Sequence, residues 1–234
     1  MRTHHRDPAP LSAAPHLARF QRIFAERGMP PGGTLVSDTP EPIPALEAAQ
    51  ARIPRLYREA IADHPRVTAW VHAIAGTAKA PNLRARRQVT HGPSLLLVGR
   101  TGRGKTHQAF GAIRSLLGAG IDARWHATTA ADLYAEMRPR QGADPEWMLR
   151  RIIRTPVLIL DDLGAAKSSE WTEELTYRLI NQRSIHQLPT LVTSNLPIRD
   201  LRAQIGDRVA SRLTGMCEQV VFTGPDRRRP DSTV

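Results

Sequence analysis

Residues 99–106 have the most definite chemistry in the chain, because they read G-R-T-G-R-G-K-T and match the phosphate-binding pattern G-x-x-x-x-G-K-[ST] in full. Glycines let such a loop turn tightly and point N–H groups at phosphate oxygens, and the next helix presents its positive dipole end to them. Lys105 can reach the β- and γ-phosphates, and the Thr106 hydroxyl can coordinate Mg²⁺. The predicted nucleotide-binding residues are Gly99, Arg100, Thr101, Gly102, Arg103, Gly104, Lys105, Thr106 and His107.

Two acids, Asp161 and Asp162, follow the apolar run at 157–160. A phosphate-binding loop needs an acid at such a place to hold Mg²⁺, and we predict that Asp161 does so together with Thr106. Asp162 is then the candidate general base that polarises the attacking water. An ordinary surface turn is the alternative interpretation. The complete phosphate-binding loop upstream favours the catalytic one, and two adjacent acids favour hydrolysis by water over a small-molecule kinase.

Three further residues could act on the γ-phosphate. Asn195 follows the apolar strand at 190–193, where a polar side chain can hold the attacking water, although asparagine also ends strands for turn reasons. Arg208 and Arg212 are four residues apart and therefore share one face of a helix. An arginine delivered to the γ-phosphate, often from a neighbouring subunit, stabilises the charge of the transition state. A pair of solvated helix arginines is the alternative.

The elements that must position these residues alternate between strand and helix patterns, which predicts an α/β fold with a doubly wound parallel sheet. In such a sheet, ligands bind beyond the carboxyl ends of the strands, where all three motifs fall. Strands are expected at 94–98, 123–127, 157–160, 190–193 and 219–223. Helices are expected at 11–27, from 45 onward, and at 54–62, 66–74, 107–117, 129 or 130 to 137, 146–154, 171–186 and 209–216.

The 234 residues carry a formal net charge of +11, and the basic excess favours a nucleic-acid partner. Only three of the 33 basic residues are lysines, so the arginine bias can also reflect genome composition. No apolar run approaches the length of a membrane span, and no secretory signal is visible. The single cysteine, Cys217, excludes an internal disulfide and a cysteine-based zinc site. A cytoplasmic protein without a membrane partner is the simplest interpretation.

The chain divides into two predicted parts. Residues 1–45 combine an amphipathic helix at 11–27 with a linker at 29–44 that is rich in proline and glycine, and we predict a partner-binding segment there. Residues 46–234 are the predicted ATPase domain. A lone helix cannot bury a core of its own, so the helix at 11–27 either packs on the main domain or binds a partner.

With these motifs in order, the chain resembles the AAA+ ATPases of the DnaC and IstB group, the replicative helicase loaders and transposition helper ATPases. The resemblance covers about residues 50–225 and is carried by the loop at 99–106, L-I-L-D-D-L-G at 158–164, T-S-N at 193–195 and the segment 207–213. It implies ATP and Mg²⁺ as cofactors, Asn195 as the sensor-1 residue and Arg212 as a trans-acting arginine finger. Segment 52–57 looks like the family's adenine-proximal stretch, which adds Ile53 and Pro54 to the ATP site.

The resemblance also implies partners. Helices between the second strand and the acidic pair touch single-stranded DNA in this group, so the candidate DNA-binding residues are Arg138, Arg140, Arg150, Arg151 and Arg154. A solubilising surface is the alternative for each. A trans-acting finger implies a homo-oligomer, of which a hexamer is one form. The chain has no room for a helical lid after the last strand, which predicts weak hydrolysis by the isolated subunit.

Four functions remain as hypotheses from the sequence. The first is an ATP-dependent helicase loader that binds the replicative helicase and single-stranded DNA during replication initiation. The second is an IstB-like transposition helper, which shares every motif; the N-terminal helix and short C-terminus favour the loader. A small-molecule kinase is disfavoured by the acid pair and T-S-N. A non-hydrolysing binding protein is disfavoured by the intact Lys105, Thr106, Asp161 and Asp162.

Overall fold

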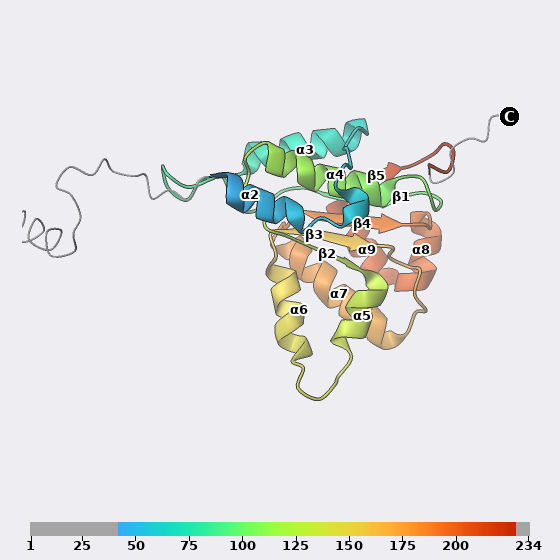
Figure 1. Ribbon diagram of the computed structural model, residues 1–234. Helices are drawn as coiled ribbons and strands as arrows, with labels where there is room; N and C mark the ends of the chain where they lie inside the picture. The colour runs from blue at the N-terminus through green and yellow to red at the C-terminus, as the bar shows by residue number, and fades with distance from the viewer. Residues whose placement is uncertain (1–41, 228–234) are drawn as a thin grey trace, which may run out of the picture. The chain divides into compact units, whose positions relative to one another are not determined.

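The computed structural model describes residues 42–227, which form alternating helices and strands (Figure 1). The strands are β1 Ser94–Val98, β2 Trp125–Thr129, β3 Val157–Asp161, β4 Thr190–Ser194 and β5 Cys217–Val221. The helices are α2 Pro42–Ala51, the 3₁₀ helix η2 Arg55–Tyr57, α3 Pro65–Thr77, α4 Lys105–Gly118, α5 Ala130–Met137, α6 Pro145–Arg154, α7 Glu170–Ile185, α8 Ile198–Ile205 and α9 Asp207–Met216. Within 42–227, no helix is both long enough and apolar enough to span a bilayer.

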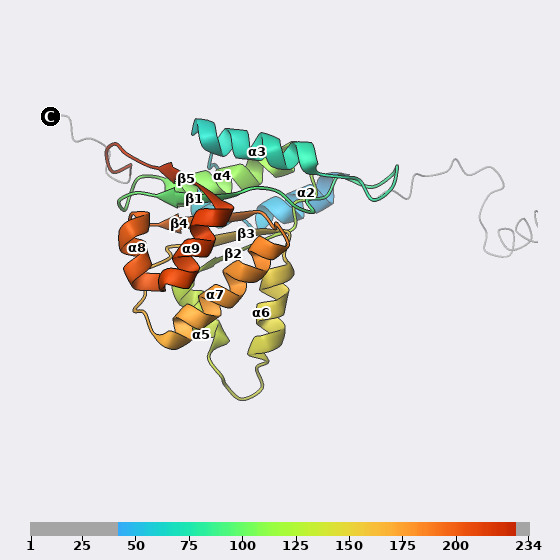
Figure 2. The ribbon, with the colours of Figure 1, turned by 180° about the vertical axis from the view of Figure 1, so that it is seen from behind.

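All five strands form one parallel sheet in the order β2-β3-β4-β1-β5. Helices α3 and α4 cover one face, and α5 to α9 cover the other, as Figure 1 and the reverse view in Figure 2 show. The register pairs Leu96 of β1 with Val192 of β4 on one side and with Gln219 of β5 on the other. The predicted fold class, a parallel sheet flanked by helices, is confirmed.

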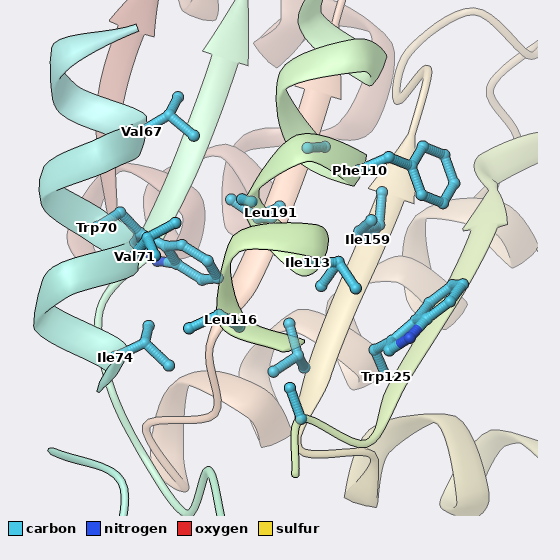
Figure 3. Packing of buried hydrophobic residues seen from close by; sticks show 14 of the residues in the cluster. Val67, Trp70, Val71, Ile74, Phe110, Ile113, Leu116, Trp125, Ile159 and Leu191 are labelled. Carbon is cyan, nitrogen blue, oxygen red and sulfur yellow. The ribbon is translucent and has the colours of Figure 1, made fainter. Parts of the chain in front are cut away.

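Each face of the sheet has its own hydrophobic core, because successive strand residues point to opposite faces. Leu95 and Leu97 of β1 belong to the core beneath α3 and α4, whereas Leu96 and Val98 belong to the core beneath α5 to α9. Figure 3 shows the first core, where α3 and α4 side chains gather over those of the strands. Strands buried on both faces explain the continuous apolar runs in the sequence.

Several elements of the structure differ from the predicted ones. The helix predicted at 54–62 is wrong: only the short η2 forms there, and a turn and a stretch without regular structure follow it. Helix α8, which starts directly after Pro197, has no counterpart among the predicted elements. Strand β5 begins at Cys217, two residues before the predicted start, and β2 begins two residues after its own. The helix predicted at 11–27 lies outside the described residues, and α2 begins inside the predicted linker.

Arg183 of α7 is fully buried and ties the elements together at the amino ends of β3 and β4. Its Nη1 donates to the carbonyl oxygens of Ile153 at 2.9 Å and Thr155 at 2.7 Å. Nη2 donates to the Pro189 carbonyl at 2.8 Å, and Nε to the Thr190 hydroxyl at 2.8 Å. Burial lowers the pKa of Arg183 to about 9, so the guanidinium stays mostly charged at neutral pH. One side chain thus joins the end of α6 to the starts of two central strands.

We expect Arg183→Met to lower the free energy of unfolding by roughly 3–5 kcal/mol, because several buried carbonyl oxygens lose their donor. Urea denaturation followed by circular dichroism measures the change. Arg178→Met is the matched control, since it breaks an exposed pair with Glu146 from the same helix and should cost less than about 1 kcal/mol. Equal losses in the two variants would contradict the structural role of Arg183.

Candidate functional site

A cavity of about 700 Å³ lies at the carboxyl ends of β1, β3 and β4. The predicted phosphate-binding loop, the two acids and Asn195 all reach this place, although they are far apart in sequence. We call it the P-loop cavity. Its lining consists of Leu56, Tyr57, Thr101, Gly102, Gly104, Lys105, Thr106, His107, Asp161, Asp162, Thr193, Asn195 and Arg227.

The loop enters α4 through glycines in conformations that other residues rarely adopt. Gly102 and Gly104 adopt positive φ angles of 80° and 85°, a conformation that costs little only for glycine. Gly104 is the N-cap of α4, and no side chain accepts a hydrogen bond from the first turn of that helix. By contrast, α5, α6 and α7 each begin with a side-chain cap. A glycine N-cap supplies no side-chain acceptor of its own to this turn, and a helix that begins in this way can bind an anion at its N-terminus.

Lys105 is the first residue of α4, and its side chain is largely buried beside the loop. Its Nζ donates to the carbonyl oxygens of Gly99 at 2.6 Å and Arg100 at 3.1 Å. It also donates to Oδ1 of Asn195 at 2.7 Å. The lysine thus bonds to the loop backbone and to the polar residue that directly follows β4.

Asp161 accepts hydrogen bonds from two hydroxyl groups at the end of β3. Thr106 Oγ1 donates to Asp161 Oδ1 at 2.9 Å, and Thr193 Oγ1 donates to the same oxygen at 2.6 Å. A carboxylate and a hydroxyl that lie this close supply the hard oxygen ligands that Mg²⁺ prefers. The residues present therefore fit the predicted magnesium site at Thr106 and Asp161.

Asp162 has a backbone conformation that is rare for a residue with a side chain, since its φ is 59°. Its amide donates to Thr193 Oγ1 at 2.9 Å, and its carboxylate accepts from the Asn195 side-chain amide. Thr193 thus bonds to both acids at once. Asn195 bonds to Asp162 through its amide nitrogen and to Lys105 through its oxygen, which gives a continuous chain from the loop to the second acid.

Two side-chain nitrogen atoms in and beside the loop have no hydrogen-bond partner within residues 42–227. These are Arg103 Nη1 and His107 Nδ1, which are both buried. A buried polar group without a partner is costly, so the unpaired guanidinium nitrogen is an independent sign that an anionic ligand completes this site.

The structure places the predicted adenine-proximal residues differently from the sequence analysis. Ile53 is 2% exposed and belongs to the core beneath α3 and α4, and neither it nor Pro54 lines the P-loop cavity. Leu56 and Tyr57 line it instead, and the Tyr57 ring stacks on Phe110 of α4 with centroids 4.7 Å apart. The assignment of Ile53 and Pro54 to the ATP site rests on the resemblance of segment 52–57 alone and stays a prediction.

Sequence reasoning also missed Arg227, which follows β5 and lines the cavity. Its amide donates to the Gly102 carbonyl at 2.9 Å, and its side chain lies so close to Gly104 that a Cβ there would meet Arg227 Cδ at 3.3 Å. The neighbouring Asp226 carboxylate packs against Gly102. No motif marks this contact, since it depends on the turn after β5 coming back over the loop.

Arg208 and Arg212 of α9 lie away from the P-loop cavity and line a separate hollow with Tyr177 of α7. The Arg208 guanidinium stacks 3.9 Å from the Tyr177 ring centre and pairs with Glu174 at 3.6 Å. Its hydrogen bond lowers the pKa of Tyr177, and Arg212 has a smaller effect in the same direction. Within the subunit, neither arginine reaches the P-loop cavity lining.

The five predicted DNA-binding arginines are all exposed but fall into two groups. Arg138 and Arg140 lie at the connection between α5 and α6. Arg150, Arg151 and Arg154 lie on the last two turns of α6 and line a groove beside β2. The structure therefore does not bring all five together.

Comparisons with known proteins agree with this architecture. The sequence profile of the family described as IstB-like ATP binding protein matches residues 75–231. An ATP-binding protein of an insertion sequence from Mycobacterium tuberculosis is 28% identical over 65% of this chain and 63% of its own length. The replicative helicase loader DnaC of Escherichia coli K12 is 24% identical over 51% of this chain. The match spans 49% of that loader, so less than two thirds of each relative is covered.

Solved structures show the same fold. The crystal structure of the DnaC helicase loader superposes with a TM-score of 0.60 at 24% identity, over 73% of this chain and 100% of that one. Domain III of the Thermotoga maritima replication initiation protein DnaA gives a TM-score of 0.52 at 20% identity, over 72% and 67% of the two chains. The five-stranded sheet is thus that of an AAA+ P-loop protein.

We expect Thr193→Val to weaken binding of a fluorescent ATP analogue in the presence of Mg²⁺ by about tenfold, because the two acids lose the hydroxyl that both contact. Fluorescence anisotropy measures the affinity. Thr193→Ser keeps the hydroxyl and serves as the control, with expected binding within about twofold of the wild type. Equal binding by the valine and serine variants would contradict the role of this hydroxyl in arranging the acids.

Proposed function

Because the chain belongs to the family of IstB-like ATP binding proteins, we propose that it hydrolyses ATP and uses the cycle to load a replicative DNA helicase onto single-stranded DNA. The observation that carries the hydrolytic part is the hydrogen-bonded chain Lys105–Asn195–Asp162 at the P-loop cavity. It joins a phosphate-binding cation to a candidate general base through one amide side chain.

In the proposed reaction, Lys105 exchanges its loop carbonyl partners for the β- and γ-phosphate oxygens of ATP. Asn195 and Asp162 then hold a water molecule against the γ-phosphorus. The water oxygen forms a bond to the γ-phosphorus while the bond between that phosphorus and the β–γ bridging oxygen breaks. A proton of the water passes to the Asp162 carboxylate. The products are ADP and inorganic phosphate.

Thr106 and Asp161 are the residues proposed to hold Mg²⁺, which would offset phosphate charge when bound. The same hydroxyl and carboxylate hold each other in position in the structure described above. Arg103 and Arg227 are near enough to the loop to add positive charge around the phosphates. Leu56 and Tyr57 supply the apolar side of the cavity, where we propose that the adenine packs.

We propose that Arg212 completes the site of a neighbouring subunit. It lies on α9, outside the lining of its own P-loop cavity, so it cannot act on its own nucleotide without a large rearrangement. Arg208 is the weaker candidate, since it already stacks on Tyr177 and pairs with Glu174. A finger supplied in trans requires head-to-tail assembly of identical subunits.

The loader assignment is supported by the names of the curated relatives, which include the helicase loaders DnaC of Escherichia coli and DnaI of Bacillus subtilis. We further propose that residues 1–45 bind the helicase.

The second candidate function is that of a transposition helper, which the family description and the insertion-sequence protein of Mycobacterium tuberculosis favour. Both functions would use the same ATPase, so only the partner separates them.

We expect Asp162→Asn and Arg212→Ala each to lower the rate of ATP hydrolysis by at least about a hundredfold. The first variant loses the general base, and the second loses the positive charge that stabilises the transition state. Mixing the two inactive proteins should restore hydrolysis. A subunit with intact Asp162 then receives Arg212 from its neighbour at about one quarter of the interfaces of a random equimolar mixture. Phosphate release measures the rate.

The control for the mixing experiment is Arg199→Ala, an exposed arginine on α8 that should leave hydrolysis unchanged. Absence of recovery in the mixture, with both single variants still binding the ATP analogue, would overturn the trans role of Arg212. Hydrolysis that Arg212→Ala does not affect would overturn any role for it in the reaction.

The partner is tested by purifying the tagged full chain from its native cells with ATP and Mg²⁺ present, and by identifying what copurifies. We expect the replicative helicase, and we expect a chain without residues 1–28 to lose it while it retains ATP-analogue binding. A transposase in place of the helicase would establish the transposition helper. Helicase capture that survives the deletion would contradict the proposed role of the N-terminal segment.

A further inference from the structure

The stretch from the end of η2 to the start of α3 begins with Leu56 and Tyr57, which form the apolar side of the P-loop cavity. We call residues 56–64 the 56–64 segment. After a turn at 58 and 59, residues 60–63 form neither helix nor strand. The Leu56 and Ile61 side chains are 80% and 63% exposed, so their burial does not hold the segment in place. Other contacts must fix it, and α4, the helix that follows the phosphate-binding loop, provides them.

Gln108 of α4 supplies hydrogen bonds to the irregular part of the 56–64 segment. This side chain is 1% exposed, and its Nε2 donates to the Ile61 carbonyl at 3.2 Å and to the Asp63 carboxylate. Its Oε1 accepts from the His64 amide at 3.0 Å. Both ends of one buried amide are thus used on four consecutive residues. Moving the segment away would leave buried polar groups without partners, which costs free energy.

Gly111 lies three residues further along α4 and lets the backbone of the 56–64 segment approach the helix closely. A Cβ at this position would lie 2.5 Å from the Ala62 nitrogen and 2.5 Å from the Ile61 carbonyl carbon. The neighbouring atoms belong to the backbone, so they cannot rotate aside as the end of a flexible side chain could. Gly111 lies inside a regular helix, and glycine is therefore required here for space and not for conformation. An added methyl group would have to push the segment away.

Arg114 extends the same set of contacts by another three residues. Its Nη1 donates to the Ala60 carbonyl at 2.8 Å, and its Nη2 pairs with Glu59 at 3.5 Å. Positions 108, 111 and 114 are spaced by three, so they lie on one face of the helix. Thr68 of α3 adds one more hydrogen bond, to the Ala62 carbonyl at 2.9 Å. One face of α4 thus holds most of the 56–64 segment.

Helix α4 begins at Lys105, so its first turn belongs to the phosphate side of the P-loop cavity and its following turns hold the apolar side. We propose that Gln108 and Gly111 are positioning residues for nucleotide binding. They set the apolar side at the distance from the phosphate-binding loop that lets the base and the triphosphate of one nucleotide bind together. This inference rests on the proposed function, because it concerns the adenine of bound ATP.

The test compares two ligands on the full chain, each by isothermal titration calorimetry with Mg²⁺ present. One is a non-hydrolysable ATP analogue, and the other is inorganic tripolyphosphate, which has neither base nor ribose. We expect Gly111→Ala to weaken binding of the analogue by about tenfold, because the displaced segment no longer meets the base. Tripolyphosphate should bind this variant within about twofold of the wild type. Gln108→Leu should act in the same direction, since it removes the hydrogen bonds to residues 61–64.

The matched control is Gly118→Ala, at the last residue of the same helix, where an added Cβ meets no atom of the described residues within 4 Å. It should bind both ligands within about twofold of the wild type. A double-mutant cycle with Tyr57→Ala then asks whether Gly111 acts through the apolar side. In a chain that already carries Tyr57→Ala, we expect Gly111→Ala to weaken analogue binding by less than about twofold more.

Three results would overturn the inference and leave the proposed function standing, provided that the wild type binds the analogue. The first is equal weakening of both ligands by Gly111→Ala, which is the result expected from a general loss of folding. The second is analogue binding by Gly111→Ala that matches Gly118→Ala. The third is a pair of fully additive losses in the cycle with Tyr57→Ala. A wild-type chain that does not bind the analogue would overturn the inference and the proposed function together.

Discussion

The parallel pairing of β4 between β1 and β3 is the constraint on which the rest of the structure depends. Parallel strands end at the same edge of a sheet, so whatever follows each strand must meet there. The phosphate-binding loop follows β1, the acids end β3, and Asn195 follows β4. A shift in the register of β4 by one residue would turn its buried side chains to the opposite face and separate Thr193 from both acids. The sheet therefore fixes the polar network, and the helices on both faces fix the sheet.

The residues at the two ends of the parallel strands differ in chemistry. At the carboxyl ends, Lys105 and the polar residues at the ends of β3 and β4 form hydrogen bonds among themselves. We propose that ATP binding opens this network. At the amino ends, the buried Arg183 side chain joins the starts of β3 and β4 to the end of α6 through hydrogen bonds. The same end of α6 carries the exposed side chains of Arg151 and Arg154.

Several features of the P-loop cavity cost stability and are retained where chemistry is proposed. Asp162 has a positive φ, Lys105 is largely buried, and Arg103 has a buried nitrogen without a partner in the described part of the chain. Strained or unpaired groups persist when the surrounding structure holds them in place, and they gather at functional sites. Here the hydrophobic cores on both faces of the sheet supply that support.

The sequence by itself determined the loop, the acid pair and the parallel sheet, because these follow from local patterns: glycine spacing, apolar runs and the residues that end them. Only the tertiary structure decided which distant residues join them. Leu56 and Tyr57 enter the P-loop cavity because the segment after α2 forms a short turn in place of a helix, and Arg227 enters it because the chain returns after β5. Arg52 meets Trp125 across 73 residues of sequence. Such contacts depend on the packing of whole elements, and no local pattern records them.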